Sequence, residues 1–217
     1  MDRLLVATTN PDKLREIRGI LDHLPVKIMT LRDLAPVPEP EETGGTFDEN
    51  ARLKALYYDA VALAGPAPQR AGDQGWDPTQ VHPRYAVAED SGLVIDALDG
   101  EPGVLSARFL RPDATYPERF SEIYRRLDEA PSRGRSARFV CALAVVHAGT
   151  VVYETTGTIE GSIADAPRGV AGFGYDPVFY YPPYGRTLGE VTEEAKLRVA
   201  HRGEAFRRWA AWLEQHL

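Results

Sequence analysis

The N-terminal part of the chain combines a short apolar run with a longer segment of helical periodicity. Residues 4–7, Leu-Leu-Val-Ala, are continuously apolar, which is typical of a buried strand. Beyond a polar turn, apolar residues recur at the 3.6-residue period of a helix; they are Leu14, Ile17, Ile20, Leu21 and Leu24. A second apolar run follows at residues 26–29. This part of the chain therefore predicts a strand, a helix and another strand.

The same patterns predict the elements that follow. Residues 46–49, Thr-Phe-Asp-Glu, have the sequence of a capping box, which begins a helix running toward Leu63 before Gly65 and Pro66 end it. Residues 65–84 hold four prolines and predict a mobile surface loop. Further helices are predicted at residues 115–130 and in a C-terminal tail that includes residues 205–213, and further strands at residues 85–88, 139–146 and 151–156.

The order of these elements predicts the fold class. Strands and helices alternate, and the strands at 139–146 and 151–156 are close enough to form an antiparallel hairpin, so we expect an α/β fold with a mixed sheet. A chain of 217 residues without internal repeats suits one large domain or two lobes. It has neither a signal-peptide pattern nor an apolar run of about 18 residues. We therefore expect a cytoplasmic protein that does not enter a membrane.

Charge and composition narrow the classes of ligand. The net charge of −7 argues against a broad nucleic-acid surface, so a polyanionic ligand would need local cations or a metal ion. Lysine is scarce among the 25 basic residues, which favours specific roles for a compact ammonium group; the lysines are Lys13, Lys27, Lys54 and Lys196. The single cysteine, Cys141, excludes an intramolecular disulfide and is expected to be a small buried side chain.

The turn before the first helix is a candidate anion site. Asn10 suits the N-cap and Pro11 the first helical position, so free backbone N–H groups and the positive end of the helix dipole would point to one place. Lys13 in the first turn opposes that dipole unless an anion lies between the two. The segment lacks the Walker pattern. A strand and helix with a solvated Lys13 explains this segment equally well.

Two acidic pairs form the next candidate feature. Glu41 and Glu42 precede the second helix, and Glu89 and Asp90 follow the apolar strand at residues 85–88. Carboxylates gathered without basic neighbours favour a hard cation, and Mg²⁺ held together with substrate phosphates is the natural candidate. A glutamate pair in a loop is usually solvated surface, whereas acids at a strand end more often face a ligand.

The remaining candidates are polar and aromatic. Asn50 and Lys54 lie four residues apart and share one helix face, although an exposed polar stripe is the simpler interpretation. The segment Phe173-Gly174-Tyr175-Asp176-Pro177 combines an aromatic ring for base stacking with a carboxylate, or is a tight turn with a core phenylalanine. Lys196 and the pair His201-Arg202 lie near the C-terminus, and alone they are weak signals.

Taken together, these segments resemble the inosine/xanthosine triphosphate pyrophosphatase family, also called Ham1-like or non-standard purine NTP pyrophosphatases. The matching segments occur in the family's order over nearly the whole chain; they are residues 8–13, 41–44, 46–51, 88–93, 102–103, 106–109 and 172–177, Lys196, and residues 201–203. One such motif would be a weak signal, but the ordered set is specific.

The resemblance implies an α/β fold whose elongated mixed sheet is flanked by helices and forms two lobes of one domain around a central cleft. It implies a homodimeric enzyme that hydrolyses ITP, dITP and XTP to the monophosphate and pyrophosphate. Mg²⁺ would be held by Glu41 and Asp90, with Asp90 also the proton acceptor. The residues implied to bind substrate are Thr8, Thr9, Asn10, Pro11, Asp12, Lys13, Lys54, Ser91, Phe173, Gly174, Tyr175, Asp176, Lys196, His201 and Arg202.

Three other hypotheses compete with this one. A Maf-like nucleotide pyrophosphatase would act on other modified nucleotides, but His201-Arg202 and the segment 173–176 favour the purine enzyme. A nucleotide-binding module without hydrolysis would not need a carboxylate base beside the α-phosphate. A nucleic-acid-binding protein fits poorly with the acidic composition.

Overall fold

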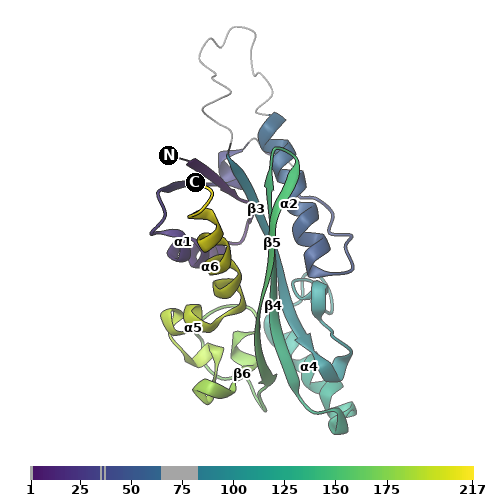
Figure 1. The fold of residues 1–217 in the computed structure, drawn as a ribbon. Helices are drawn as coiled ribbons and strands as arrows, with labels where there is room; N and C mark the ends of the chain where they lie inside the picture. Colours follow the sequence, from purple (N-terminus) through teal and green to yellow (C-terminus); the bar gives the residue numbers. More distant parts are fainter. Residues whose placement is uncertain (1, 35, 37, 65–82) are drawn as a thin grey trace, which may run out of the picture. The chain divides into compact units, whose positions relative to one another are not determined.

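A mixed β-sheet forms the framework of the protein. The computed structural model describes residues 2–34, 36, 38–64 and 83–217 (Figure 1). In this part of the chain, seven strands pair in the order β2-β1-β3-β4-β5-β6-β7. They are β1 (Asp2–Val6), β2 (Val26–Thr30), β3 (Tyr85–Ile95), β4 (Ser136–His147), β5 (Thr150–Ile163), β6 (Phe179–Tyr181) and β7 (Arg186–Thr187). Strands β2 and β3 run parallel to β1, whereas β6 runs antiparallel to β5 and β7. The predicted mixed α/β sheet is confirmed.

The helices agree in number and place with most of the sequence patterns. They are α1 (Pro11–Leu21), α2 (Phe47–Ala64), α4 (Tyr116–Glu129), α5 (Glu193–Val199) and α6 (His201–Leu213). Short 3₁₀ turns lie at Leu31–Asp33, Asp96–Leu98, Gly103–Leu105, Pro131–Arg133, Asp176–Val178, Pro182–Tyr184 and Leu188–Glu190. No described helix is long and apolar enough to cross a membrane. The predicted loop at 65–84 lies outside the described residues except for Pro83 and Arg84.

One predicted strand end and one predicted helix cap differ from the structure. Strand β3 does not end before Glu89 but continues to Ile95, because the residues after Asp90 are again apolar and buried. The capping box of α2 is half formed. Thr46 Oγ1 accepts from the Glu49 N–H at 3.2 Å, but the Glu49 carboxylate accepts from the Gly45 N–H at 2.7 Å. The Glu49 side chain therefore binds the backbone of the loop before α2 and not the N-cap residue.

The chain divides into two compact units. The first comprises residues 1–90, 142–155 and 205–217. In it, Leu5 of β1 and Ala86 of β3 share a core cluster with Ala51 and Ala55 of α2. The small alanine side chains let α2 lie close to this face of the sheet. Helix α1 and the C-terminal part of α6 lie on the opposite face (Figure 1).

The second unit comprises residues 91–141 and 156–204. Its core joins α4 to the strands: Phe120, Ile123 and Leu127, which the sequence places on one helix face, pack in one cluster with Phe139 of β4 and Phe179 of β6. The apolar face of α4 is thus buried against the strands, as its amphipathic pattern predicts.

We predict that Gly161→Ala destabilises this second unit. A Cβ at Gly161 would lie 2.4 Å from the Tyr180 carbonyl oxygen and 2.7 Å from the Phe179 ring, so backbone must move. We expect a loss of about 2 kcal/mol in unfolding free energy by urea titration. Gly45→Ala is the matched control, since the nearest atom lies at 3.7 Å. Equal stability of the two variants would contradict the packing at Gly161.

Candidate active site

The turn before α1 is built as the sequence predicts. The Asn10 side chain caps the helix, because its Oδ1 accepts from the Asp12 N–H at 2.9 Å and the Lys13 N–H at 3.2 Å. Pro11 occupies the start of the helix, and Thr8 Oγ1 accepts from the Asn10 N–H at 3.2 Å. Thr8 and Thr9 line a hollow of about 700 Å³ beside α1. The turn thus presents hydroxyl groups next to open space.

Lys13 is paired with a buried acid. Its Nζ lies 2.6 Å from Glu89 Oε1, and the Glu89 side chain is only 3% exposed. This contact excludes the interpretation of Lys13 as a solvated lysine. The anion that relieves the conflict between Lys13 and the helix dipole is, in this structure, the carboxylate of Glu89.

Asp90 lies at the centre of a second charged group. Lys54 Nζ lies 2.9 Å from Asp90 Oδ1 and 2.7 Å from Glu42 Oε1, so one ammonium joins two carboxylates. Asn50 Nδ2 donates to the other Asp90 oxygen at 3.3 Å. Asn50 and Lys54 therefore share one face of α2, as their spacing predicts, and this face is turned toward β3 rather than solvent.

Burial and the charge of the paired side chain shift the pKa values of Asp90 and Lys54 in opposite directions. Burial raises the pKa of the Asp90 carboxyl; the attraction and hydrogen bond of Lys54 act against the rise, while Glu42 and Glu89 add to it. Burial would lower the pKa of Lys54, but Asp90 and Glu42 together hold that pKa above its usual value. Asp90 thus has an unusual affinity for a proton, and Lys54 stays charged beside it.

The two neighbouring glutamates before α2 differ in position. Glu41, the predicted metal ligand, is exposed, whereas Glu42 is half-buried and contacts Lys54. Among the residues that the structure describes, no group of three or more acidic, histidine or cysteine side chains could hold a metal alone. The carboxylates of Glu42 and Asp90 nevertheless fit Mg²⁺, because this ion commonly takes one or two carboxylates and completes its shell with phosphates and water.

The second unit assembles most of the remaining candidates. Asp176 Oδ2 accepts from Lys196 Nζ at 2.6 Å and from the Phe173 N–H at 2.8 Å. Lys196 Nζ lies 4.2 Å from the centre of the Phe173 ring and Arg202 Cζ lies 5.7 Å from it. Arg202 Nη2 also donates to Ser91 Oγ at 3.0 Å. A half-buried aromatic ring is thus bordered by two cations and a buried carboxylate.

The other two aromatic candidates of this unit face the core. The His201 ring stacks on Phe139 with 4.9 Å between centroids. Tyr175 is 4% exposed, and its hydroxyl donates to the Ser106 carbonyl at 2.8 Å. Gly172 must be glycine, because its φ is +71° and a Cβ there would lie 2.1 Å from Asp176 Oδ2. Tyr175 and Gly172 therefore shape the segment around Phe173.

Sequence reasoning missed some residues that the structure adds to these groups. Glu42 has the same local sequence signal as Glu41, so only the fold distinguishes them. Phe139 lies in an apolar segment and Ser106 in a turn segment. Nothing in either segment predicts a contact with His201 or Tyr175. The contact between Asn50 and Asp90 could have been expected from the shared face of Asn50 and Lys54.

Comparison with known proteins identifies the family of the chain. The family model described as the Ham1 family matches residues 4–212, and the chain belongs to that family. It is 42% identical to a dITP/XTP pyrophosphatase of Geobacter sulfurreducens over all of this chain and 97% of that protein. It is 37% identical to one of Halalkalibacterium halodurans, over 99% of this chain and 100% of that protein.

Solved structures give the same result for the fold. A HAM1 protein from Coxiella burnetii superposes with a TM-score of 0.83 at 35% identity, covering 99% of this chain and 100% of the other. The Staphylococcus aureus Ham1 protein gives a TM-score of 0.80 at 30% identity, covering 100% of both chains. The family resemblance predicted from the sequence is confirmed.

We predict that Lys13→Met destabilises the protein, since it leaves the buried Glu89 without this cation. The expected loss is about 2 kcal/mol in urea unfolding, and Lys13→Met combined with Glu89→Gln should recover part of it. Lys27→Met removes an exposed lysine and serves as control. If Lys13→Met were as stable as the control, the pair would have no role in holding α1 to β3.

Proposed function

We propose that this protein hydrolyses non-standard purine nucleoside triphosphates, namely ITP, dITP and XTP, to the nucleoside monophosphate and pyrophosphate. The observation that carries the proposal is the order of side chains along β3. Glu89 and Asp90 contact the lysines of the first unit, and the next residue, Ser91, contacts Arg202 of the second. One strand thus carries both sets of residues that the family resemblance assigns to a single nucleotide. The names of the relatives, dITP/XTP pyrophosphatases, support the same activity.

The first unit supplies the groups for phosphates and metal. Lys13, Lys54 and the N-terminus of α1 offer positive charge and N–H donors to a triphosphate. Asp90 and a glutamate of the pair 41–42 would hold Mg²⁺; the resemblance favours Glu41, but the contact with Lys54 favours Glu42. Bound there, Mg²⁺ would neutralise charge on the phosphate oxygens.

Asp90 is the proposed proton acceptor. A water oxygen forms a bond to the α-phosphorus, the bond from that phosphorus to the bridging oxygen breaks, and pyrophosphate leaves with that oxygen. The water's proton passes to the Asp90 carboxylate. The raised pKa of Asp90 suits this role, because a base with more affinity for protons removes one more readily. Lys13 would stabilise the charge that develops on pyrophosphate.

The second unit supplies the groups for the base. The half-buried Phe173 ring offers a stacking surface, and Lys196 and Arg202 are donors only. Hypoxanthine and xanthine present an oxygen at C6, which such donors can bind, whereas adenine presents an amine. A mismatch of this kind can give discrimination of about 10⁴-fold. Guanine shares the C6 oxygen, so rejection of GTP must involve another position of the ring.

The proposal includes a homodimer located in the cytoplasm, as the family resemblance implies. Sedimentation velocity of the purified chain gives the mass directly. A mass of about 48 kDa, twice that of the 24.0 kDa chain, supports the dimer, whereas a monomer at micromolar concentration contradicts it.

The activity is tested by incubation with ITP, XTP, GTP or ATP and MgCl₂, followed by anion-exchange separation of the products. We expect IMP and XMP with equimolar pyrophosphate, and loss of hydrolysis in EDTA. Orthophosphate as the first product would contradict the proposed bond cleavage. Nucleotide binding without any hydrolysis would favour a binding module.

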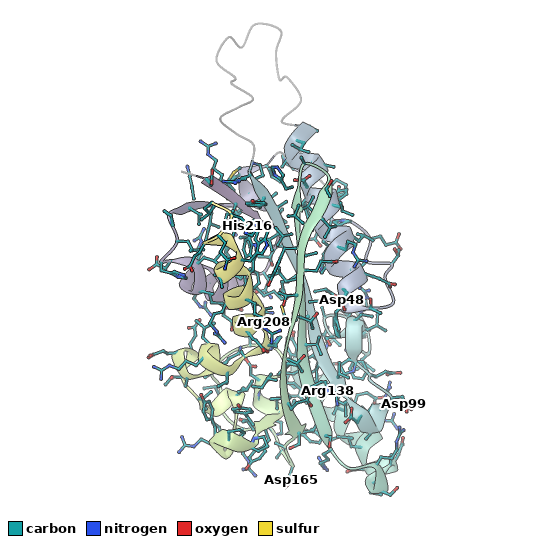
Figure 2. The ribbon with its side chains drawn as sticks, in the orientation of Figure 1. Asp48, Asp99, Arg138, Asp165, Arg208 and His216 are labelled. Atoms are coloured by element: carbon teal, nitrogen blue, oxygen red, sulfur yellow. The ribbon has the colours of Figure 1, made fainter. Side chains whose placement is uncertain are left out.

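We predict that Asp90→Asn lowers kcat for ITP by about 10³-fold, because the amide cannot accept the proton. Binding of ITP, measured by calorimetry, should remain detectable. Asp48→Asn is the control, since Asp48 is an exposed residue of α2 (Figure 2). Turnover by Asp90→Asn at the rate of the control would remove Asp90 from the mechanism.

A second prediction concerns the pH dependence of hydrolysis. Lys54 holds the pKa of Asp90 below the value that burial alone would produce. Lys54→Met should therefore raise that pKa and move the acidic limb of the profile of kcat/KM against pH upward by about 1 unit. Lys27→Met should leave the limb in place. A limb at the same pH in Lys54→Met would show that Asp90 is not the group that titrates.

A further inference from the structure

Helix α4 carries a buried arginine in an unusual setting. Arg119 is 4% exposed, and the other buried residues of α4 are Phe120, Ile123 and Leu127. In the described part of the chain no carboxylate forms an ion pair with it, and its Nε has no hydrogen-bond partner there. A guanidinium group cannot lose its charge in a protein, and burial without a counter-ion is costly. The contacts of Arg119 must therefore explain why its charge is tolerated in the interior.

Arg119 is directed at two aromatic side chains. Its Cζ lies 5.0 Å from the centre of the Tyr116 ring, and its positive charge opposes the rise that burial causes in the pKa of Tyr175. The Pro112 carbonyl oxygen lies 3.4 Å from Nη2. The Tyr175 hydroxyl donates to the Ser106 carbonyl oxygen at 2.8 Å. Arg119 thus contacts Tyr116 through a cation–π interaction and acts on Tyr175 through its charge.

Both aromatic residues hold the segment from Phe173 to Asp176. Tyr175 belongs to that segment, and the Tyr116 ring meets it edge to face with 5.3 Å between centroids. The Tyr116 hydroxyl also lies 3.5 Å from the place of a Cβ on Gly174, where φ is +66°. The Tyr116 ring, which contacts Arg119, therefore packs against the segment at Gly174 and Tyr175.

The same contacts connect the segment to β3. Ser106, which accepts from Tyr175 through its carbonyl, also accepts from the Leu93 N–H through its Oγ at 2.9 Å. Leu93 lies two residues beyond Ser91, whose Oγ accepts from Arg202. A continuous path of hydrogen bonds thus runs from Tyr175 through Ser106 to the strand that carries Ser91.

From these contacts we infer that Arg119 is a positioning residue for base recognition. It fixes the Tyr116 ring through their cation–π contact, and that ring packs against Tyr175 and so fixes the segment that presents Phe173 and Asp176 to the purine. Arg119 contacts Tyr116 and the Pro112 carbonyl, and it acts on Phe173, Lys196 and Arg202 only through the segment. Its loss should weaken binding of the base and leave phosphate chemistry intact. This inference rests on the proposed function and adds to it a residue that the family resemblance does not assign.

The test compares Arg119→Met, which keeps the length of the side chain, with Arg125→Met. Arg125 is an exposed residue of the same helix that pairs with Glu122 and Glu129. We expect Arg119→Met to raise KM for ITP by about tenfold and to change kcat by less than about twofold. The preference for ITP over ATP should fall, Arg119→Lys should restore part of the affinity, and Arg125→Met should match wild type.

A second variant tests the route through Tyr116. Tyr116→Leu removes the aromatic ring that Arg119 contacts, so it should raise KM in the same way. The double variant Arg119→Met/Tyr116→Leu should show no larger rise than the larger single change, because both remove the same cation–π contact. Should Arg119→Met fail to fold, Arg119→Lys and Tyr116→Leu carry the same comparison.

Three results would overturn the inference. They are an unchanged KM with only a lower melting temperature, a fall in kcat at constant KM, and additive effects in the double variant. Failure of the proposed function is distinct, since wild-type protein would then release no pyrophosphate from ITP. In that case the Kd of IMP, measured by calorimetry, replaces KM; a tenfold weakening in Arg119→Met supports the inference and an equal Kd overturns it.

Discussion

The pairing of two adjacent buried acids with two lysines is the interaction on which the candidate site depends. Glu89 and Asp90 are consecutive residues of β3. Lys13 of α1 pairs with Glu89, and Lys54 of α2 pairs with Asp90. Each helix is thereby held to β3 by the residue that a phosphate would also require. The charged groups that stabilise the fold are thus the same groups that are proposed to act on the substrate.

The residues proposed to recognise the base are also held by paired charges in the second unit. Asp176 is buried, and it is tolerated because Lys196 and the Phe173 N–H donate to one of its oxygens. These bonds leave the Phe173 ring half-buried beside cations. The chain has a net charge of −7, and its buried acids hold individual lysines in place at the candidate site. Each unit thus carries preformed charge that a ligand would not need to assemble.

Much of this arrangement could be predicted from the sequence because its signals are local. The Asn10 cap, the shared face of Asn50 and Lys54, and the apolar face of α4 each follow from spacing over a few residues. The choice between Glu41 and Glu42 could not be predicted, since adjacent residues of one motif differ only in where the folded loop directs them. Arg119 was hidden for the opposite reason: an arginine on an amphipathic helix predicts an exposed position, and only tertiary packing buries it.

The proposed attack of water on the α-phosphorus beside Asp90 can be followed by isotope labelling. ITP is hydrolysed in ¹⁸O-labelled water, and the two products are separated and weighed by mass spectrometry. We expect one ¹⁸O atom in IMP and none in pyrophosphate. Label in pyrophosphate would place the attack at the β-phosphorus and contradict the assignment of Asp90 and its lysine partner to the α-phosphate.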